Sequence, residues 1–435
     1  MSRLLIISYL FPPVGGVGVQ RALSLAKYLP DSGFDVHVLT ARNAAGPVQD
    51  PALLKQVPAS VKVHKAFTPE LPFHFRQKLW RWFSGGGAKG QTAFPTAAPS
   101  QRSWWKKLPL EIARRILCPE PEVLWVPFAL RRARAIVKKY DIQAVLVTAP
   151  PFSAFLVGNE LKREFPQLKL ITDFRDDWLR FYLGEFDYQK GDYTRRRAIA
   201  IEGKTVALSD RVVVVTQSML EHIRARYPAQ DSNKFAFIPN GYDPECFAGF
   251  QPRPRSEAKI VVSHVGTVYS ASSARYYLDA LDELPEEVRG GIETRFIGRI
   301  ADDEKPFLAS RRSQITALGF MPQDQALRQM QETDFLLLVM TDAPSLTGKL
   351  FEYLATGKPI LAIAPRDGEV AHILQETGAG WCAPPDDPAG VRSMLRHAFE
   401  HARDGRNGFN PDRDAIRKFE RPRLAAEYGR LIAEA

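Results

Sequence analysis

Lys349 and Glu352 stand three residues apart in the segment TGKLFEYLATGKPILA (347–362), a spacing that brings two side chains together on a helix. Side chains lean toward the N-terminus of their helix, where unsatisfied N–H groups and a partial positive charge favour a phosphate. Lys349 would add a full charge to a diphosphate bound there, and Glu352 would accept hydrogen bonds from ribose hydroxyls. The alternative is a surface ion pair worth about 0.3–0.5 kcal/mol, and these residues alone leave both interpretations open.

The surrounding residues predict the helix that would position this pair, from about Leu346 to Thr356. Gly357 suits a left-handed C-terminal cap, and Pro359 prevents the helix from continuing. The residues that would face the core are Phe351, Leu354 and Ala355.

Length and composition predict a globular protein of two domains. The chain has 435 residues, of which 45% are apolar and 25% charged. Its three cysteines, Cys118, Cys246 and Cys382, match no metal-binding spacing and indicate a reducing compartment. No apolar run reaches the roughly 18–20 residues of a membrane span. The net charge of +10 favours an anionic partner, and because we find no nucleic-acid motif we expect that partner not to be nucleic acid.

Apolar strands alternate with amphipathic helices along the first half of the chain. The strands are expected at 4–9, 34–40, 144–148, 169–174 and 211–216. Buried strands separated by helices predict a parallel sheet covered on both faces. The loop FPPVGGVGVQR (11–21) joins the first strand to the first helix, and its glycines would let the backbone approach a ligand closely.

A second series of strands follows the stretch 246–258, which is rich in Pro and Arg and is interpreted as a linker. These strands are expected at 259–266, 293–298, 315–320, 334–340 and 359–365. The predicted fold class is α/β, with two Rossmann-like doubly wound domains facing each other across a cleft. The expected boundaries are 1–245 for the N-terminal domain, 259–412 for the C-terminal domain and 413–435 for a final helix.

Residues 72–117 interrupt the first domain with a different composition. Trp, Phe, Lys and Arg are dense around the low-complexity stretch GGGAKGQ (85–91), as in a helix that lies on an anionic membrane. A surface excursion that packs its aromatic side chains on its own domain would have the same composition. Both interpretations stay open.

Several segments, taken in their order along the chain, resemble the GT-B glycosyltransferases, in particular the retaining family 4 of bacterial polysaccharide biosynthesis. The segment GKLFEYLATGKPILA (348–362) is similar to the donor-binding signature of that family. The other matching segments are FPPVGGVGVQR (11–21), DFRDDW (173–178), FIPNGYDPECF (237–247), HVGTVY (264–269) and FERPRLAAEYGRLI (419–432), the last being similar to the helix that crosses back to the N-terminal domain.

The resemblance implies a binding site for a nucleotide-diphosphate sugar, with Lys349 and Glu352 as its main polar residues. The donor-binding residues that it implies are Gly15, Gly16, Gly266, Thr267, Arg299, Phe320, Met321, Thr347, Gly348, Lys349 and Glu352. The backbone of Phe320 and Met321 would contact the nucleobase, whereas the alternative is a Phe and a Met that face the core. Arg299 would contact phosphate, whereas the alternative is an ordinary solvated side chain.

Asp173, Arg175 and Asp176 lie at the end of an expected strand and form the acceptor-side candidates. They would contact the sugar or the acceptor, or form a buried Arg–Asp network that shapes the loop. Lys349, Glu352 and Asp176 are the catalytic candidates, with Asp176 or Asp173 as the base if the reaction inverts. His264 and His372 are interpreted as packed or capping side chains.

The sequence therefore predicts a retaining hexosyltransferase that moves a sugar from a nucleotide-diphosphate sugar to a glycan or lipid-linked acceptor. No cofactor or metal is expected, because we find no His/Asp/Glu cluster typical of a catalytic metal site. The expected location is the cytoplasm, with a peripheral position at the inner face of the membrane as a further hypothesis. The alternatives are a sugar-nucleotide epimerase of the same fold and a non-catalytic subunit of a polysaccharide assembly.

Overall fold

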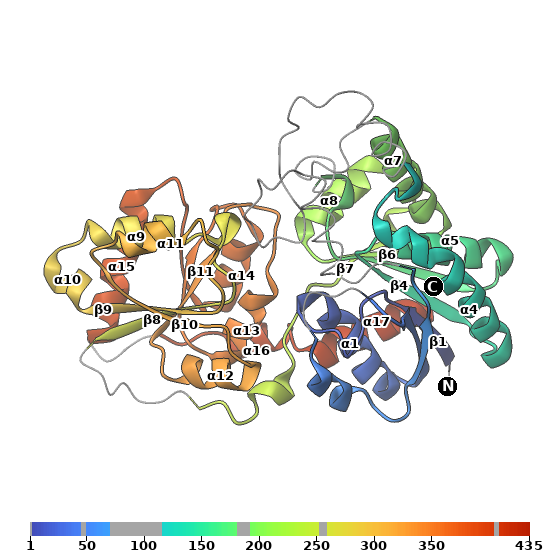
Figure 1. Cartoon of the computed structure of the whole chain (residues 1–435), viewed down its shortest axis with the longest axis horizontal. Helices are drawn as coiled ribbons and strands as arrows, with labels where there is room; N and C mark the ends of the chain where they lie inside the picture. The colour runs from blue at the N-terminus through green and yellow to red at the C-terminus, as the bar shows by residue number, and fades with distance from the viewer. Residues whose placement is uncertain (1, 45–48, 70–114, 181–191, 252–258, 404–408) are drawn as a thin grey trace. The chain divides into compact units, whose positions relative to one another are not determined.

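The computed structural model describes residues 2–44, 49–69, 115–180, 192–251, 259–403 and 409–435. The chain divides into two compact units, Met1–Pro239 with Arg421–Ala435 (unit 1) and Asn240–Glu420 (unit 2) (Figure 1). Nearly all of the basic-aromatic segment 72–117 lies outside the described residues, so the prediction for it stays a prediction.

Unit 1 contains a seven-stranded parallel sheet in the order β3-β2-β1-β4-β5-β6-β7. Its strands are β1 (Ser2–Ile7), β2 (Phe34–Ala41), β3 (Lys62–Ala66), β4 (Ala144–Ala149), β5 (Lys169–Phe174), β6 (Arg211–Val214) and β7 (Phe235–Phe237). The central strands are mainly apolar and buried because both faces of the sheet are covered, as the sequence pattern predicts.

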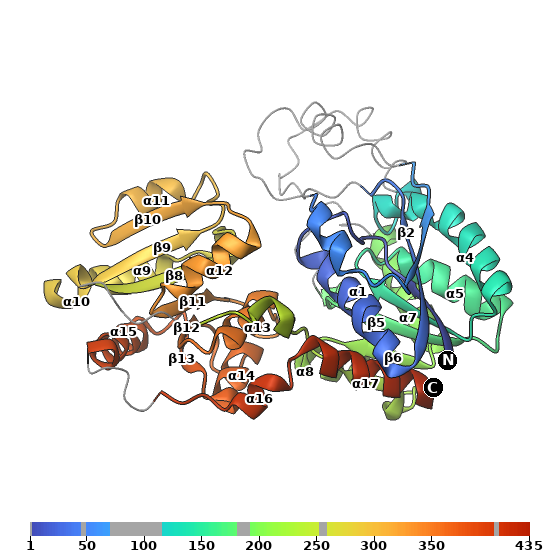
Figure 2. The ribbon, with the colours of Figure 1, turned by 90° about the horizontal axis from the view of Figure 1, so that it is seen from below.

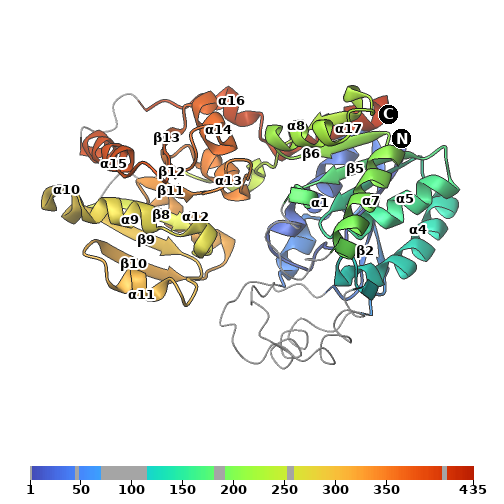
Figure 3. The ribbon, with the colours of Figure 1, turned by 90° about the horizontal axis from the view of Figure 1, so that it is seen from above.

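Helices cover the two faces of this sheet in two groups. One face carries α1 (Val17–Tyr28) and α17 (Arg421–Glu434), which lie side by side in Figure 2. The other carries α4 (Val126–Tyr140), α5 (Ala154–Glu164), α7 (Asp192–Leu208) and α8 (Gln217–Arg226), seen in Figure 3. The strand order grows outward in both directions from β1 and β4, and right-handed crossovers then place the helices on opposite faces.

Unit 2 repeats this arrangement with a six-stranded parallel sheet in the order β10-β9-β8-β11-β12-β13. Its strands are β8 (Ile260–Val265), β9 (Ile292–Ile297), β10 (Gln314–Gly319), β11 (Phe335–Val339), β12 (Ile360–Ile363) and β13 (Gly380–Ala383). One face packs against α9 (Arg275–Asp282) and α15 (Pro388–Arg403). The other packs against α12 (Gln323–Gln331), α13 (Gly348–Thr356), α14 (Glu369–Thr377) and α16 (Arg413–Arg417). The short helices α10 (Glu286–Gly290) and α11 (Lys305–Ala309) precede β9 and β10.

The fold class is confirmed as α/β with two doubly wound Rossmann-like units, but the unit boundaries differ from those expected. Unit 1 ends at Pro239 rather than at residue 245, because the Tyr242 N–H donates to the Phe419 carbonyl (3.0 Å) and Tyr242 packs in the core of unit 2. The expected final helix 413–435 is two helices, of which α16 belongs to unit 2 and α17 to unit 1.

Candidate functional site

Helix α13 begins at the carboxyl ends of the strands of unit 2, as the residues around Lys349 predict. Thr347 is its N-terminal cap, and the Thr347 hydroxyl accepts a hydrogen bond from the Lys349 N–H (3.4 Å). Gly357 ends the helix in the left-handed conformation (φ 64°), as predicted. Phe351 and Leu354 are buried in the core, and Ala355 is half-buried.

Tyr353 fixes the position of α13 on the sheet. The Val265 N–H at the end of β8 donates to the Tyr353 hydroxyl (2.8 Å), which donates in turn to the Leu337 carbonyl of β11 (3.4 Å). Strands β8 and β11 are neighbours at the point where the strand order reverses. In open parallel sheets this is the place where ligands bind.

Lys349 lies directly over Gly266, the first residue after β8. A Cβ atom added to Gly266 would come within 2.4 Å of the Lys349 Cε atom and 2.5 Å of its Nζ atom. Gly266 has a φ of 122°, and a Cβ on Gly298 would come within 2.2 Å of the Gly266 carbonyl oxygen. Two glycines at the ends of β8 and β9 therefore make the space that the lysine side chain occupies.

His264 is the hydrogen-bond partner of the Lys349 ammonium. Its Nδ1 atom lies 3.1 Å from the Leu337 carbonyl oxygen, which can only accept, so Nδ1 carries the proton. The Nε2 atom then accepts a hydrogen bond from Lys349 Nζ at 3.3 Å. The side chain is buried, which agrees with the packing interpretation, whereas His372 is exposed and is therefore not a packed side chain.

Both groups of this pair have perturbed pKa values. Burial lowers the pKa of Lys349 to about 8, against the charge of Glu352, which raises it. Burial and the charge of Lys349 lower the pKa of His264 to about 3, against contacts with the Leu337 and Thr267 carbonyls. The imidazole is therefore neutral and the ammonium is charged at pH 7. Perturbed lysines of this kind are concentrated at functional sites.

The remaining donor-binding candidates of unit 2 lie at the start of α13 or follow the ends of β8, β9 and β10. Gly348 is the first residue of α13, and Thr267, which follows β8, is exposed. Arg299 lies over the ring of Phe320, with its guanidinium carbon 5.2 Å from the ring centroid. Because Phe320 is 65% exposed, it does not face the core, and Met321 is half-buried. The structure thus places an exposed aromatic ring and a cation at the carboxyl end of β10.

In unit 1, Gly15 and Gly16 form the junction between the first loop and α1. Gly16 is the N-terminal cap of α1 with a φ of 95°, and it is exposed, whereas Gly15 is buried. The peptide bond between Pro12 and Pro13 is cis. The loop follows β1, whose neighbour β4 lies across the point where the strand order of this sheet reverses.

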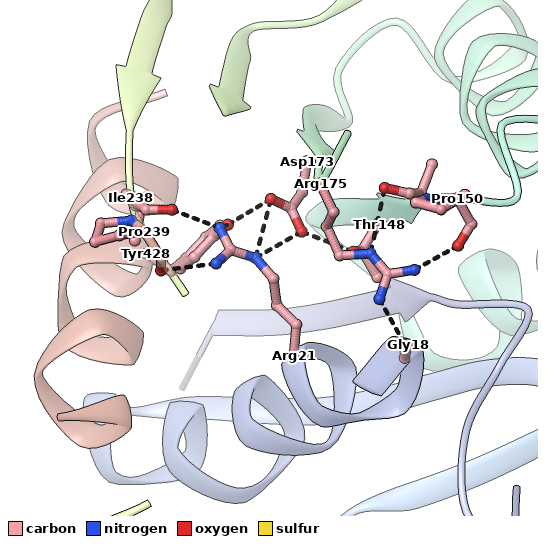
Figure 4. Close-up of polar contacts among 10 residues, drawn as sticks. Gly18, Arg21, Thr148, Pro150, Asp173, Arg175, Ile238, Pro239 and Tyr428 are labelled. Carbon is pink, nitrogen blue, oxygen red and sulfur yellow. Dashed lines mark hydrogen bonds and ion pairs between the residues drawn. The ribbon is translucent and has the colours of Figure 1, made fainter. Parts of the chain in front are cut away.

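Asp173 belongs to a buried network, which is the structural alternative given above (Figure 4). Its carboxylate accepts hydrogen bonds from Arg21 Nε (3.0 and 3.1 Å), the Thr148 hydroxyl (2.7 Å) and the Tyr428 hydroxyl (2.7 Å). Arg21 also donates to the Ile238 and Pro239 carbonyls, both at 2.8 Å. Although burial opposes the charge, Asp173 and Tyr428 raise the pKa of Arg21. The network ties α1, β5, β7 and α17 together.

Arg175 and Asp176 have different surroundings at the end of β5. Arg175 donates to the carbonyls of Ala149, Pro150 and Gly18, so it holds the first loop to the end of β4 (Figure 4). Asp176 is exposed. Surrounding protein atoms raise the pKa of Asp176 and Arg175 lowers it, and the contact of this side chain with solvent limits both effects.

Sequence reasoning missed Arg21 and Tyr428, and it did not connect His264 with Lys349. Arg21 is the last residue of the segment FPPVGGVGVQR, and its partner Asp173 is 152 residues away. The signal that could have found it is a charged residue at a position of α1 that its apolar neighbours assign to the core.

The described residues contain no group of three or more His, Cys, Asp or Glu side chains placed to hold a metal ion. Within the same residues, no helix combines the length and the apolar character needed to cross a bilayer.

Comparison with known proteins agrees with this geometry. Residues 93–246 match the family model described as Glycosyltransferase Family 4. A structure of Anabaena Alr3699/HepE in complex with UDP is similar over the whole of both chains, with a TM-score of 0.62 and 13% identity. A structure of the lipopolysaccharide outer core galactosyltransferase WaaB is similar over the whole of both chains, with a TM-score of 0.60 and 13% identity. The chain has the GT-B glycosyltransferase fold. The family 4 resemblance that the sequence indicates is thus confirmed.

A curated relative supports the same class. The Pseudomonas aeruginosa protein named "Probable glycosyltransferase WbjE" is 24% identical over 203 residues, which are 44% of this GT-B chain and 50% of the relative. The chain thus matches about half the length of that relative. The prediction of a glycosyltransferase is supported by the family match and by this relative together.

Proposed function

We propose that the protein transfers a sugar, with retention of configuration, from a nucleotide-diphosphate sugar to a glycan or lipid-linked acceptor. The observation that carries this proposal is the position of the Lys349 ammonium. It lies over Gly266 at the N-terminus of α13. Its hydrogen-bond partner His264 is neutral, so the two side chains form no ion pair that would compete with an anionic ligand. A diphosphate at this helix end would meet free N–H groups, the helix dipole and one full positive charge.

In the proposed reaction, the bond between the sugar and the diphosphate oxygen breaks as the acceptor oxygen bonds to the same carbon. Negative charge grows on the leaving diphosphate, where Lys349, the start of α13 at Gly348 and the Gly266–Thr267 backbone would stabilise it. Preorganised donors of this kind contribute about 2.7–4 kcal/mol each. The leaving phosphate would take the acceptor proton, so no side-chain base and no metal is required. Glu352, one turn along α13, would hold the ribose hydroxyls.

The structural neighbours support the donor class. Alr3699/HepE, whose fold this chain shares, has been crystallised with UDP and with UDP-glucose. We propose that the diphosphate lies at Lys349 and that Arg299 and the backbone of Phe320 and Met321 contact the nucleotide. Gly15 and Gly16 stay donor-binding candidates, and Asp176 stays a catalytic candidate. If the reaction were inverting, the exposed Asp176 would be the base, because Asp173 is enclosed in its network.

The acceptor and the location are proposals from composition. The net charge of +10 and the basic-aromatic residues of 72–117 suit a peripheral position on an anionic membrane, where a lipid-linked glycan would be met. Liposome flotation with neutral and anionic vesicles tests this position. Equal binding to both vesicles would contradict it.

Nucleotide binding is the first test of the transfer proposal. A thermal-shift screen against UDP, GDP and ADP should find one that stabilises the protein by about 2.7 kcal/mol at 100 times its dissociation constant. We expect Lys349→Met, Glu352→Gln and Gly266→Ala to weaken that nucleotide at least tenfold, the last because its new Cβ displaces the lysine. The control Lys305→Met removes an exposed cation paired with Asp302 and should change nothing.

Two results would contradict the proposal. Unchanged nucleotide affinity in both Lys349→Met and Glu352→Gln would show that the assigned pocket is wrong. Conversion of the nucleotide sugar to an isomer without any acceptor would indicate an epimerase. With an acceptor supplied, NMR of the product's anomeric proton shows whether configuration is retained.

A further inference from the structure

We propose that a small pocket in unit 1, beyond the carboxyl ends of β1 and β2, binds a phosphoryl group of the acceptor. The phosphoryl-binding site itself is inferred from the pocket, and its assignment to an acceptor rests on the proposed function. The pocket is distinct from the candidate diphosphate site, which lies in unit 2.

The pocket is built from two loops and one strand. Its lining residues are Phe11, Pro12, Pro13, Val14, Ala41, Arg42, Asn43, Ala44, Gln49 and Lys65. The first four belong to the loop after β1, the next four follow or end β2, and Lys65 lies near the carboxyl end of β3. Ligands of doubly wound sheets bind beyond these strand ends.

The charges of the pocket have one sign. Of its lining residues in the described part of the chain, Arg42 and Lys65 are charged, both are exposed, and none is acidic. Among the described residues, neither cationic side chain has a hydrogen-bond or ion-pair partner. By contrast, Arg3 and Arg134 of the same unit are each paired with a carboxylate.

Asp50, the acidic residue next to the lining residue Gln49, has a structural role as a helix cap. The Asp50 carboxylate accepts a hydrogen bond from the Ala52 N–H (3.1 Å) and caps the short helix at Pro51–Gln56. Asn43 is also engaged, because its amide exchanges two hydrogen bonds with the Thr68 backbone (2.8 and 3.1 Å). Among the described residues, no carboxylate therefore forms an ion pair with either cation and competes with a bound anion.

The walls of the pocket are fixed before any ligand arrives. The Val14 N–H donates to the Phe11 carbonyl (3.1 Å), and the Asp50 N–H donates to the Pro13 carbonyl (2.7 Å). The Arg42 N–H donates to the Ala66 carbonyl (2.7 Å), which ties the turn after β2 to β3. Little ordering would be needed on binding, which favours affinity.

Size and charge together select the ligand class. The cavity has a volume of about 120 Å³, which is smaller than the roughly 300–1,000 Å³ of a pocket that encloses a whole ligand. It therefore suits one group of a larger molecule. Two cations, one of them able to form paired hydrogen bonds, match the charge and oxygen geometry of a phosphoryl group.

Calorimetry with inorganic pyrophosphate and with geranyl diphosphate tests the proposal on the full chain. We expect Arg42→Met and Lys65→Met each to raise the dissociation constant about tenfold or more, and the double variant to raise it about a hundredfold. Lys62→Met is the matched control, because Lys62 lies on the same strand and its ammonium is paired with Asp35 (3.1 Å). Lys349→Met separates this site from the site in unit 2.

The outcomes distinguish the proposals. In the Lys349→Met protein, where the candidate diphosphate site of unit 2 is weakened, binding that the Arg42 and Lys65 double change reduces and that Lys62→Met does not change supports the site. Tighter binding of geranyl diphosphate then indicates a lipid-linked source, and equal affinities indicate a soluble one. Unchanged binding in the double variant, or equal weakening in Lys62→Met, overturns it. Nucleotide affinity, measured on the same proteins, should be unchanged by Arg42→Met and Lys65→Met, so failure of the transfer proposal would show separately.

Discussion

The Nζ atom of Lys349 lies 3.3 Å from the Nε2 atom of His264, and the other imidazole nitrogen is held by a backbone carbonyl of β11. This relationship orients the ammonium without neutralising it, because the partner is an uncharged ring rather than a carboxylate. A lysine held in this way keeps its charge available for an anionic ligand. The cost is that a charged group stays partly desolvated in the free protein.

The tautomer of His264 is the first prediction. Because its pKa is lowered to about 3, the imidazole should stay neutral between pH 5 and 9, with the proton on Nδ1. ¹⁵N-histidine NMR distinguishes this tautomer from the Nε2–H form and from the imidazolium. Titration near the ordinary pKa of about 6.5 would show that the ring is not enclosed as described.

The pH dependence of nucleotide binding is the second prediction. Lys349 is protonated below its lowered pKa of about 8 and loses its charge as the pH rises through that value. Nucleotide affinity should therefore be constant from pH 6 to 7.5 and should fall above pH 8. Calorimetry of the nucleotide across this range measures the effect. In Lys349→Met the affinity should be weaker and should lack this decrease, and a decrease that persists there would belong to another group.

The stability of Lys349→Met is the third prediction. The folded pKa of about 8 lies below the ordinary lysine value, so the unfolded chain binds more protons and the wild-type protein is destabilised at neutral pH. Removing the ammonium should raise the free energy of unfolding by about 1–3 kcal/mol at pH 7. Urea denaturation measures it.

The sign of this effect can be checked with pH. The penalty is present in full below pH 8 and disappears as the pH rises toward the ordinary lysine pKa, so the advantage of the variant should shrink over that interval. Lys305→Met, at an exposed ion pair, should stay within about 0.5 kcal/mol of wild type. A Lys349→Met protein less stable than wild type at pH 7 would contradict the account.

The network of Asp173 gives the fourth prediction. Asp173→Asn leaves the buried Arg21 charge unpaired and should lower the free energy of unfolding by about 3–5 kcal/mol. Tyr428→Phe removes one buried hydrogen bond to Asp173 and should lower it by about 1–3 kcal/mol. Because the two residues are in contact, the double variant should lose less than the sum. Chemical denaturation of the four proteins measures the coupling.

An exposed pair in the same unit is the control for this cycle. Glu164→Gln breaks its ion pair with Arg134 at the surface and should cost about 1 kcal/mol or less. Wild-type stability in Asp173→Asn, combined with loss of transfer, would instead assign Asp173 to the acceptor.

The strands of the core could be predicted because their sequences are apolar runs bounded by glycine, proline or charged residues. The expected strand at 169–174 coincides with β5, and the one at 293–298 differs from β9 by one residue. The prediction missed β3, β7 and β13, which are all edge strands, and β7 has only three residues. β3 is polar and half-exposed and β13 has four residues, so neither shows the pattern of a buried strand.

The candidate site was predictable only where it depends on local pattern. Thr347, Gly348 and Gly357 define the start and end of α13, and the spacing of Lys349 and Glu352 follows from that. The partners in space were not predictable, because His264 is 85 residues from Lys349 and Asp173 is 152 residues from Arg21. Charge type alone does not say which of the many acidic and basic residues a fold brings together.

Helix α17 places the last residues of the chain in the core of unit 1, where Leu424, Tyr428 and Ile432 pack and Tyr428 bonds to Asp173. During synthesis on the ribosome, all of unit 2 is translated before this helix emerges. Until α17 emerges, the face of the N-terminal sheet that it shares with α1 is only partly covered, and Arg21 lacks its contact with Tyr428. Unit 2, being continuous in sequence, has no such delay and can complete its fold first.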